Sequence, residues 1–145
     1  MEFAITAFEA DDSCIYWLES MPQTVLVISL GAILGANLRF LIGQLSVKFF
    51  HSNLPYGTIF INVTGSFILA FFLAWTAGLV LADPRWRLFV AVGFCGGYTT
   101  YSGYAYETFA LFEQGKWLFA ALNIFVTNAL CIAAAFAGYA LARAV

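Results

Sequence analysis

Charged residues are scarce in this sequence. They make up 10% of its 145 residues, whereas hydrophobic residues make up 63% and aromatic residues 19%. A soluble globular domain carries about 25% charged residues, and each of its surface helices needs a polar face. Whole segments of this chain have no such face. The composition therefore excludes a soluble domain and indicates an integral membrane protein.

The sequence also has few basic residues, few cysteines and a single histidine. Its net charge is −2, so no basic surface is available for nucleic acid. His51 and three cysteines without paired spacing cannot form a zinc site. We expect Cys14, Cys95 and Cys131 to be free thiols that pack as small hydrophobic groups. Because no nucleophile–base pair, metal cluster or phosphate-binding loop is visible, we do not expect an enzyme.

The first 22 residues lack basic side chains altogether, yet they hold five of the eight acidic residues. A secretory signal peptide needs a positive beginning and a cleavage site of small residues, and neither is present. We therefore predict an acidic leader over residues 1–22, with a short interfacial helix beginning near Asp12 or Ser13. A regulatory or partner-binding tail is the alternative. Residues 23–145 are predicted to form the membrane domain.

Four apolar runs are long enough to cross a bilayer, whose hydrocarbon core of ~30 Å takes about 20 helical residues. Short connections that contain Pro, Gly and charged residues separate the runs. The runs cover roughly residues 24–50, 56–81, 86–112 and 117–141. The sequence therefore predicts an all-α, multi-pass membrane protein with four transmembrane helices.

The charges at and beyond the ends of these runs hardly favour either orientation in the membrane. If the amino terminus is cytoplasmic, that side carries Arg85, Arg87 and Arg143, and the opposite side carries Lys48 and Lys116. Three basic residues against two is almost no bias under the positive-inside rule. The chain could therefore insert both ways and form an antiparallel, dual-topology homodimer. The alternative is that one orientation prevails narrowly.

Arg39 is a charged residue deep in the first run. A guanidinium group at the centre of a bilayer costs between ~2.5 and more than ~10 kcal/mol, so it must be paired, be hydrated or extend to the membrane surface. Small residues precede it at about one-turn spacing, which suits close helix packing. They are Gly31, Ala32, Gly35 and Ala36.

Two stripes of small and polar residues lie in the second and fourth runs. Their members are Thr58, Asn62, Gly65 and Ser66 in the second run, and Asn123, Thr127 and Cys131 in the fourth. Spacings of three and four residues place each stripe on one helix face. Such stripes either bond helices together or line a narrow aqueous path. An Asn amide has two N–H donors and can bind a small anion without a fixed charge.

The third run is interrupted by the stretch "GFCGGYTTYSGYAYE". Its Gly-Gly and Thr-Thr pairs are poor helix formers, so we predict a break near Gly96–Thr100. Non-helical backbone at membrane depth is tolerated only where protein or a cavity surrounds it, and freed carbonyls can coordinate a bare cation. A packing kink without an ion is the alternative.

Beyond this break, Tyr101, Tyr104 and Glu107 share one helix face. A carboxylate in this position could serve as a proton or cation relay. It could equally be a structural partner for Arg39 or for a tyrosine hydroxyl. The spacing does not decide among these roles.

The stretches "GAILGANLRF", "GTIFINVTGSF" and "GFCGGYTTYSGYAYE", in this order, resemble the motifs of the bacterial Fluc (CrcB-type) fluoride channels. The resemblance covers about residues 24–141. It implies a four-helix subunit of the bacterial inner membrane that pairs with an antiparallel second copy. It further implies two fluoride pores along the dimer interface, a central structural sodium ion, and passive export of cytoplasmic fluoride.

The resemblance also implies roles for individual residues. Arg39 matches the conserved arginine of the family and Glu107 its conserved glutamate. The backbone carbonyls of Gly96 and Thr99, from both subunits, would hold the sodium ion. The pore residues that it implies are Asn62, Ser102, Asn123 and Thr127, and Thr58 joins them as a member of the second-run stripe.

The chain departs from the family at two aromatic positions. The family usually has a Thr-Thr-Phe-Ser-x-Phe pattern, whose two phenylalanines present their ring edges to fluoride, whereas this chain has Tyr101 and Tyr104. An aromatic ring has a positive edge, and a tyrosine hydroxyl adds a hydrogen-bond donor. We expect both tyrosines to line the pore and fluoride still to pass, at a reduced rate if the hydroxyls hold the ion.

Two other classes of membrane protein compete with this interpretation. A small multidrug-type, proton-coupled transporter is also a four-helix dimer, but its carboxylate would have to be Glu107, late in the third run, with Arg39 disfavouring cationic drugs. A non-conducting membrane assembly subunit is the other alternative. Fluoride transport without a pH gradient would separate the channel from both.

Overall fold

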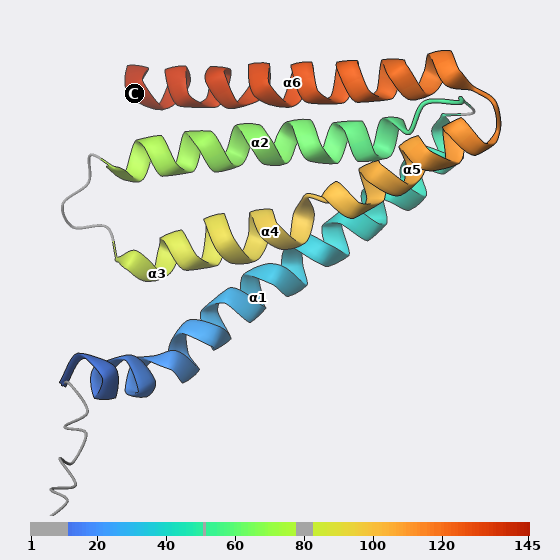
Figure 1. The fold of residues 1–145 in the computed structure, drawn as a ribbon. Coiled ribbons are helices and arrows are strands. Elements are labelled where there is room, and N and C mark those ends of the chain that lie inside the picture. The colour runs from blue at the N-terminus through green and yellow to red at the C-terminus, as the bar shows by residue number, and fades with distance from the viewer. Residues whose placement is uncertain (1–11, 51, 78–82) are drawn as a thin grey trace, which may run out of the picture.

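The computed structural model describes residues 12–50, 52–77 and 83–145, and side chains from Met21 onward. Every regular element in these ranges is helical. The elements are α1 (Asp12–Phe49), α2 (Tyr56–Ala77), a divided third helix, and α6 (Trp117–Ala144). The third helix consists of α3 (Pro84–Arg87), the π-helix η1 (Leu88–Phe94), α4 (Cys95–Tyr98) and α5 (Tyr101–Glu113). Figure 1 shows α2 between α6 and α4, and α1 running diagonally along the far side of α4.

The prediction of an all-helical membrane protein with four helices is confirmed. The segments Met21–Phe49, Tyr56–Ala77 and Trp117–Ala144 are each long and apolar enough to cross a membrane, and the third helix is divided by its break. The predicted second run extends to residue 81, and residues 78–82 lie outside the described residues. The start of α1 and the carboxyl terminus lie at the same end of the molecule, as four crossings require (Figure 1).

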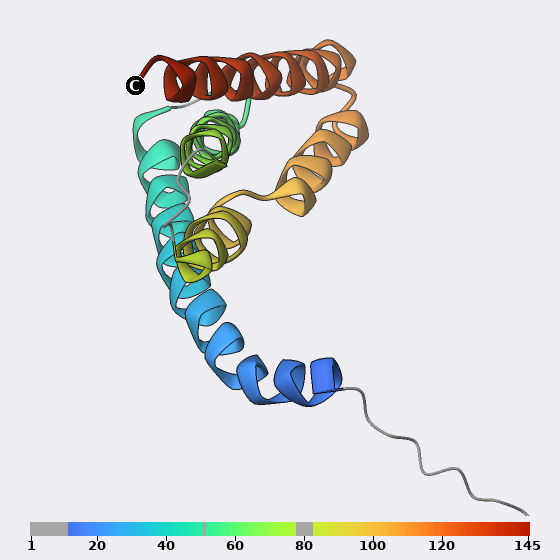
Figure 2. The same ribbon diagram turned by 90° about the vertical axis from the view of Figure 1, so that its left-hand side faces the viewer.

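α1 begins at Asp12, as predicted, but it does not stop before the membrane domain. It continues through Pro22 to Phe49 as one helix. A proline inside a helix removes one backbone hydrogen bond and bends the axis, and Figure 2 shows the first turns of α1 at an angle to the rest. Residues 1–11 of the predicted leader lie outside the described residues. The interfacial position of the leader stays a prediction.

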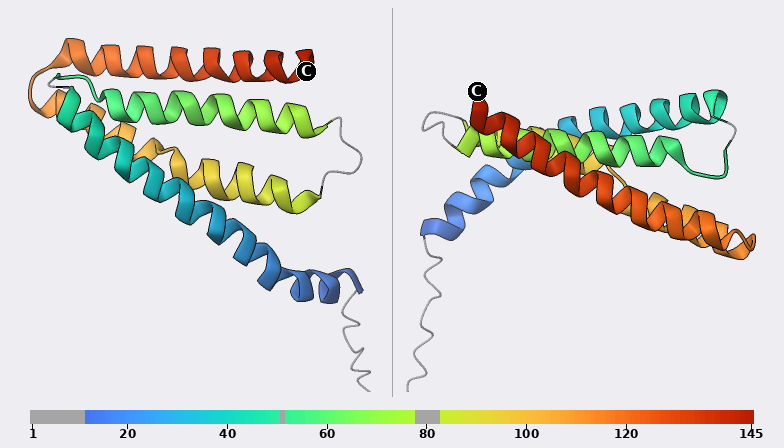
Figure 3. Two further views of the ribbon diagram at one scale, coloured as in Figure 1. Left: turned by 180° about the vertical axis from the view of Figure 1, so that it is seen from behind. Right: turned by 90° about the horizontal axis from the view of Figure 1, so that it is seen from above.

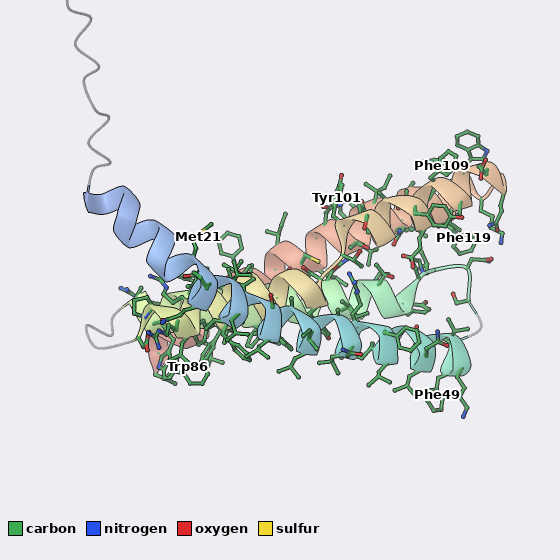
Figure 4. The ribbon with its side chains drawn as sticks, turned by 90° about the horizontal axis from the view of Figure 1, so that it is seen from below. Met21, Phe49, Trp86, Tyr101, Phe109 and Phe119 are labelled. Carbon is green, nitrogen blue, oxygen red and sulfur yellow. The ribbon has the colours of Figure 1, made fainter. Side chains whose placement is uncertain are left out.

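Polar side chains are buried inside the molecule and apolar ones cover much of its outside. Thr76, Thr108, Asn123 and Thr127 are buried, whereas many Leu, Phe and Trp side chains are exposed. A soluble protein has the opposite arrangement. Figure 4 shows Trp86 near one end of the molecule and Phe49 near the other, with Tyr101 between them. This distribution suits helices surrounded by lipid.

The small residues of the first run pack closely against the third helix. A methyl group added to Gly35 would lie 2.8 Å from the backbone nitrogen of Tyr98, and one added to Gly97 would lie 2.6 Å from the carbonyl oxygen of Ala32. Both distances are too short for a carbon atom. Figure 3 shows α1 crossing the third helix. The glycines therefore allow two backbones to touch just before the break.

We expect Gly35→Ala to lower the free energy of unfolding by about 1–3 kcal/mol, because overpacking forces the two helices apart. Gly43→Ala is the matched control, since a methyl group added at Gly43 in the same helix meets nothing within 4 Å. Alanine also favours a helix over glycine by about 1 kcal/mol, so the control should be neutral or stabilising. Titration with a denaturing detergent measures both. Equal stability of the two variants would contradict the close contact.

Candidate functional site

The third helix is interrupted at Thr99 and Thr100. α4 ends at Tyr98, and the next two residues are extended, with φ and ψ of −77° and 159° at Thr99 and of −148° and 112° at Thr100. α5 then begins at Tyr101, where the Thr100 hydroxyl accepts a hydrogen bond from the Gly103 amide at 3.0 Å. The sequence correctly predicted a break near Gly96–Thr100. A Thr cap of this kind satisfies one of the free amides at a helix start.

Asn62 holds the extended segment by two hydrogen bonds. Its Oδ1 accepts from the Thr100 amide at 2.8 Å, and its Nδ2 donates to the Thr100 carbonyl at 3.1 Å. In a continuous helix the Thr100 amide would donate to the carbonyl of Gly96, four residues earlier. The Asn62 side chain thus replaces the Gly96 carbonyl as the acceptor for the Thr100 amide. The Gly96 carbonyl is left without that amide.

The two carbonyls of the predicted sodium site have different surroundings. Gly96 is exposed, and a methyl group added to it would meet nothing within 4 Å. The Thr99 carbonyl accepts a 3.4 Å hydrogen bond from Nη1 of Arg39, which is half-buried. Arg39 therefore reaches the backbone at the break. Both carbonyls lie at the carboxyl end of α4, where helix dipoles concentrate negative partial charge.

A second contact also holds the third helix against α2. The buried hydroxyl of Tyr98 lies 2.8 Å from Oγ1 of Thr64. Thr64 donates its own proton to the Phe60 carbonyl at 2.7 Å, so Tyr98 is the donor of the pair. Neither Tyr98 nor Thr64 was predicted to have a role in the site. The signal was present, because a tyrosine hydroxyl buried among helices needs a partner.

Glu107 is paired with Thr58. The Thr58 hydroxyl donates to Oε1 of Glu107 at 2.7 Å, whereas the buried Oε2 has no hydrogen-bond partner among the described residues. Both residues line an open cavity of about 830 Å³ at one end of the molecule, together with Lys116 and Gln44. The partner of Glu107 is therefore a threonine, which the sequence did not suggest, and neither Arg39 nor a tyrosine.

The stripe on the fourth helix contacts α5. Asn123, which is completely buried, donates to Thr108 Oγ1 at 2.9 Å, and Thr127 donates to Asn123 Oδ1 at 3.1 Å. Thr108 donates in turn to the Tyr104 carbonyl at 2.7 Å. Sequence reasoning missed Thr108. These bonds connect the fourth helix to the helix that follows the break.

An open cavity of about 240 Å³ brings the two predicted stripes together beside the break. Polar and aromatic side chains from α2, the break, α5 and α6 line it. They include Asn62, Ser66, Tyr101, Tyr104, Thr127 and Asn128. The amino-terminal end of α5, with its partial positive charge, also opens here. This cavity can therefore accommodate a small anion next to uncharged hydrogen-bond donors.

Comparison with known proteins identifies the family. The family model described as "CrcB-like protein, Camphor Resistance (CrcB)" matches residues 26–139. This chain belongs to the CrcB family. A CrcB relative from Koribacter versatilis is 46% identical over 120 residues, which are 83% of this chain and 95% of the relative. One from a Sulfurihydrogenibium species is 52% identical over 121 residues, 83% of this chain and 98% of the relative. Both relatives are named fluoride-specific ion channel FluC.

The CrcB match contains the break and every candidate site residue, and it leaves out the first 25 residues. The two tyrosines that follow the break differ in exposure. Tyr101 is 80% exposed and points away from the other helices in Figure 4, whereas Tyr104 is half-buried, with the two ring centroids 5.7 Å apart. Ser102 lies beside them with its hydroxyl 3.3 Å from that of Thr100. Both tyrosines thus lie at the break of this CrcB protein.

Proposed function

We propose that this chain is the subunit of a passive fluoride channel that exports cytoplasmic fluoride across a bacterial inner membrane. The observation that carries the proposal is the family: curated CrcB relatives that the chain matches along 95% and 98% of their length are fluoride-specific ion channels. Because the relatives are channels, the proposal excludes an enzyme. They likewise give no support to a proton-coupled multidrug transporter or a non-conducting assembly subunit.

The proposed fluoride path runs along the cavity beside the break. Asn62 uses one of its two amide protons on the Thr100 carbonyl, which leaves one for an ion. Thr58 on α2 and Glu107 on α5 both line the wider cavity at one end of the molecule. We assign Asn123 and Thr127 to the wall of the path, together with Ser102, Tyr101 and Tyr104. Uncharged donors at close range suit a small anion that has lost part of its water.

We further propose that two copies pair in antiparallel orientation, with one pore on each side. Gly96 and Tyr101 support this, because both lie at membrane depth beside the break and are exposed in the single chain. Backbone at that depth must be covered by protein or face a cavity. The basic residues also favour neither end strongly, with Lys48 and Lys116 at one end and Arg85, Arg87 and Arg143 at the other.

A structural sodium ion fits between the two copies. The Gly96 carbonyl has lost its helical amide partner to Asn62, and the Thr99 carbonyl retains a second lone pair beside the 3.4 Å bond from Arg39. One chain supplies two oxygens, which is too few for a hard cation, so the set is complete only with the same two from a second copy. A bound sodium ion would supply a positive charge that holds the two breaks together.

Fluoride efflux from liposomes tests the proposed function directly. We expect the reconstituted protein to release trapped fluoride when a potassium ionophore balances the charge, with no pH gradient, and to retain chloride under the same conditions. A fluoride-selective electrode measures the release. Efflux that requires a pH gradient would instead indicate a proton-coupled transporter, and its complete absence would indicate a non-conducting subunit.

A further inference from the structure

Asn128 bonds to one of the two tyrosines that distinguish this chain from the usual family pattern. It lies on α6 off the Asn123–Thr127 stripe, and its side chain is exposed in the single chain. Its Nδ2 donates to the Ile124 carbonyl at 2.6 Å and to the Tyr104 hydroxyl oxygen at 3.0 Å. A polar side chain in the middle of a spanning helix is costly unless it faces protein or water. Asn128 is therefore a candidate functional residue.

The bonds of Asn128 fix the direction of the Tyr104 proton. A backbone carbonyl such as that of Ile124 only accepts hydrogen bonds, so the nitrogen of the amide, and not its oxygen, must face this side. That nitrogen carries two protons. One lies on the Ile124 carbonyl and the other on the Tyr104 oxygen. Tyr104 is therefore the acceptor in this pair, and its own O–H must point elsewhere.

The Tyr104 proton is available in the cavity, where the hydroxyls of Ser66 and Thr127 are already engaged. Tyr104 and Asn128 both line the cavity of about 240 Å³. The Ser66 hydroxyl in the same wall donates to the Asn62 carbonyl at 2.7 Å, and the Thr127 hydroxyl donates to Asn123 at 3.1 Å. Among the described residues, Asn128 is the hydrogen-bond partner of the Tyr104 hydroxyl, and it leaves the donor unused.

We infer that the Tyr104 hydroxyl, oriented by Asn128, is a fluoride-binding group in this pore. The inference rests on the proposed channel function and adds a binding group that a phenylalanine at this position does not have. Tyr104 contacts the ion, whereas Asn128 is a positioning residue. An O–H donor holds a fully charged anion more strongly than an aromatic ring edge does. The pore therefore saturates at lower fluoride concentration and releases the ion more slowly.

Tyr104→Phe tests the binding group. Efflux rates from liposomes, measured over a range of fluoride concentrations, should show a half-saturating concentration about tenfold higher and a higher maximal rate, as expected when one charge-assisted hydrogen bond is lost. Tyr106→Phe is the matched control, because Tyr106 lies on the same helix, is 72% exposed and does not line the cavity. It should leave both values unchanged.

Asn128→Leu tests the positioning role and also keeps the inference testable if Tyr104→Phe fails to fold. We expect a shift in the same direction in the Tyr104 background and no further shift when Tyr104→Phe is already present, since a shared interaction is lost only once. An unchanged half-saturating concentration in Tyr104→Phe overturns the inference, as does an equal effect of Asn128→Leu in both backgrounds. Absence of fluoride efflux from the unaltered protein would instead overturn the proposed function itself.

Discussion

Asn62→Leu is expected to abolish fluoride efflux and to lower the free energy of unfolding by about 2–6 kcal/mol. Leucine branches at the same carbon but leaves the amide and the carbonyl of Thr100 without their partners, which lie at 2.8 and 3.1 Å in the unaltered protein. Each backbone group left unsatisfied in a buried position costs about 1–3 kcal/mol. The substitution also removes a donor from the proposed fluoride path. Transport should therefore be lost even under conditions in which the variant stays folded.

Two variants separate these effects. Thr76→Val removes a buried hydroxyl of the same helix that donates only to carbonyls of its own helix, at Phe72 and Leu73. It should keep both transport and stability near their original values. Asn62→Asp keeps the acceptor for the Thr100 amide but turns an anionic oxygen toward the Thr100 carbonyl and the path. We expect it to fold better than Asn62→Leu and still to block fluoride. Normal efflux in either Asn62 variant would exclude Asn62 from the path.

Gly96→Leu is expected to convert the proposed dimer into single chains and to stop transport. The side chain has open space in the isolated chain, since a methyl group added at Gly96 meets nothing within 4 Å, so the fold of one subunit should persist. In the proposed dimer the same space holds the backbone of the second copy and the sodium ion. Light scattering of the protein in detergent would measure the mass of the assembly, and circular dichroism would measure its helical content.

Gly43→Leu is the matched control for this experiment. Gly43 also has open space around it, but it lies on α1 two turns beyond Gly35 and away from the break. We expect its variant to keep the mass of two copies. If Gly96→Leu keeps that mass as well, the dimer interface does not pass over the break, and the shared sodium site must be abandoned with it.

The sequence predicted the helices and the position of the break, because both depend on local chemistry. Runs of apolar residues set the four helices, and poor helix formers at Gly96–Gly97 and Thr99–Thr100 set the interruption. The polar stripe of the second run also predicted that Thr58, Asn62 and Gly65 face other helices, although it left out Thr64. What it did not predict was that Asn62 would bond to the backbone of Thr100 and not to another side chain.

Pairings between helices were the least predictable part of the site. The sequence suggested Arg39 or a tyrosine as a partner for Glu107, and the structure provides Thr58 instead. Asn128 lies outside the predicted stripe of the fourth run, yet it bonds to Tyr104. A periodic pattern fixes the direction of a side chain on its own helix, but its partner depends on the rotation and crossing of a second helix.

The divided third helix has a consequence for how the chain matures in the membrane. The segments before the break are four, seven and four residues long, and α5 has 13, so neither half is long enough to cross ~30 Å of hydrocarbon alone. The third helix must therefore cross the membrane as one piece, with its two halves in line. Asn62 supplies the bonds to the Thr100 amide and carbonyl at the interruption, so this piece depends on α2 for hydrogen bonds that a continuous helix supplies by itself. A chain in which α2 is not docked would leave both groups of Thr100 without these partners.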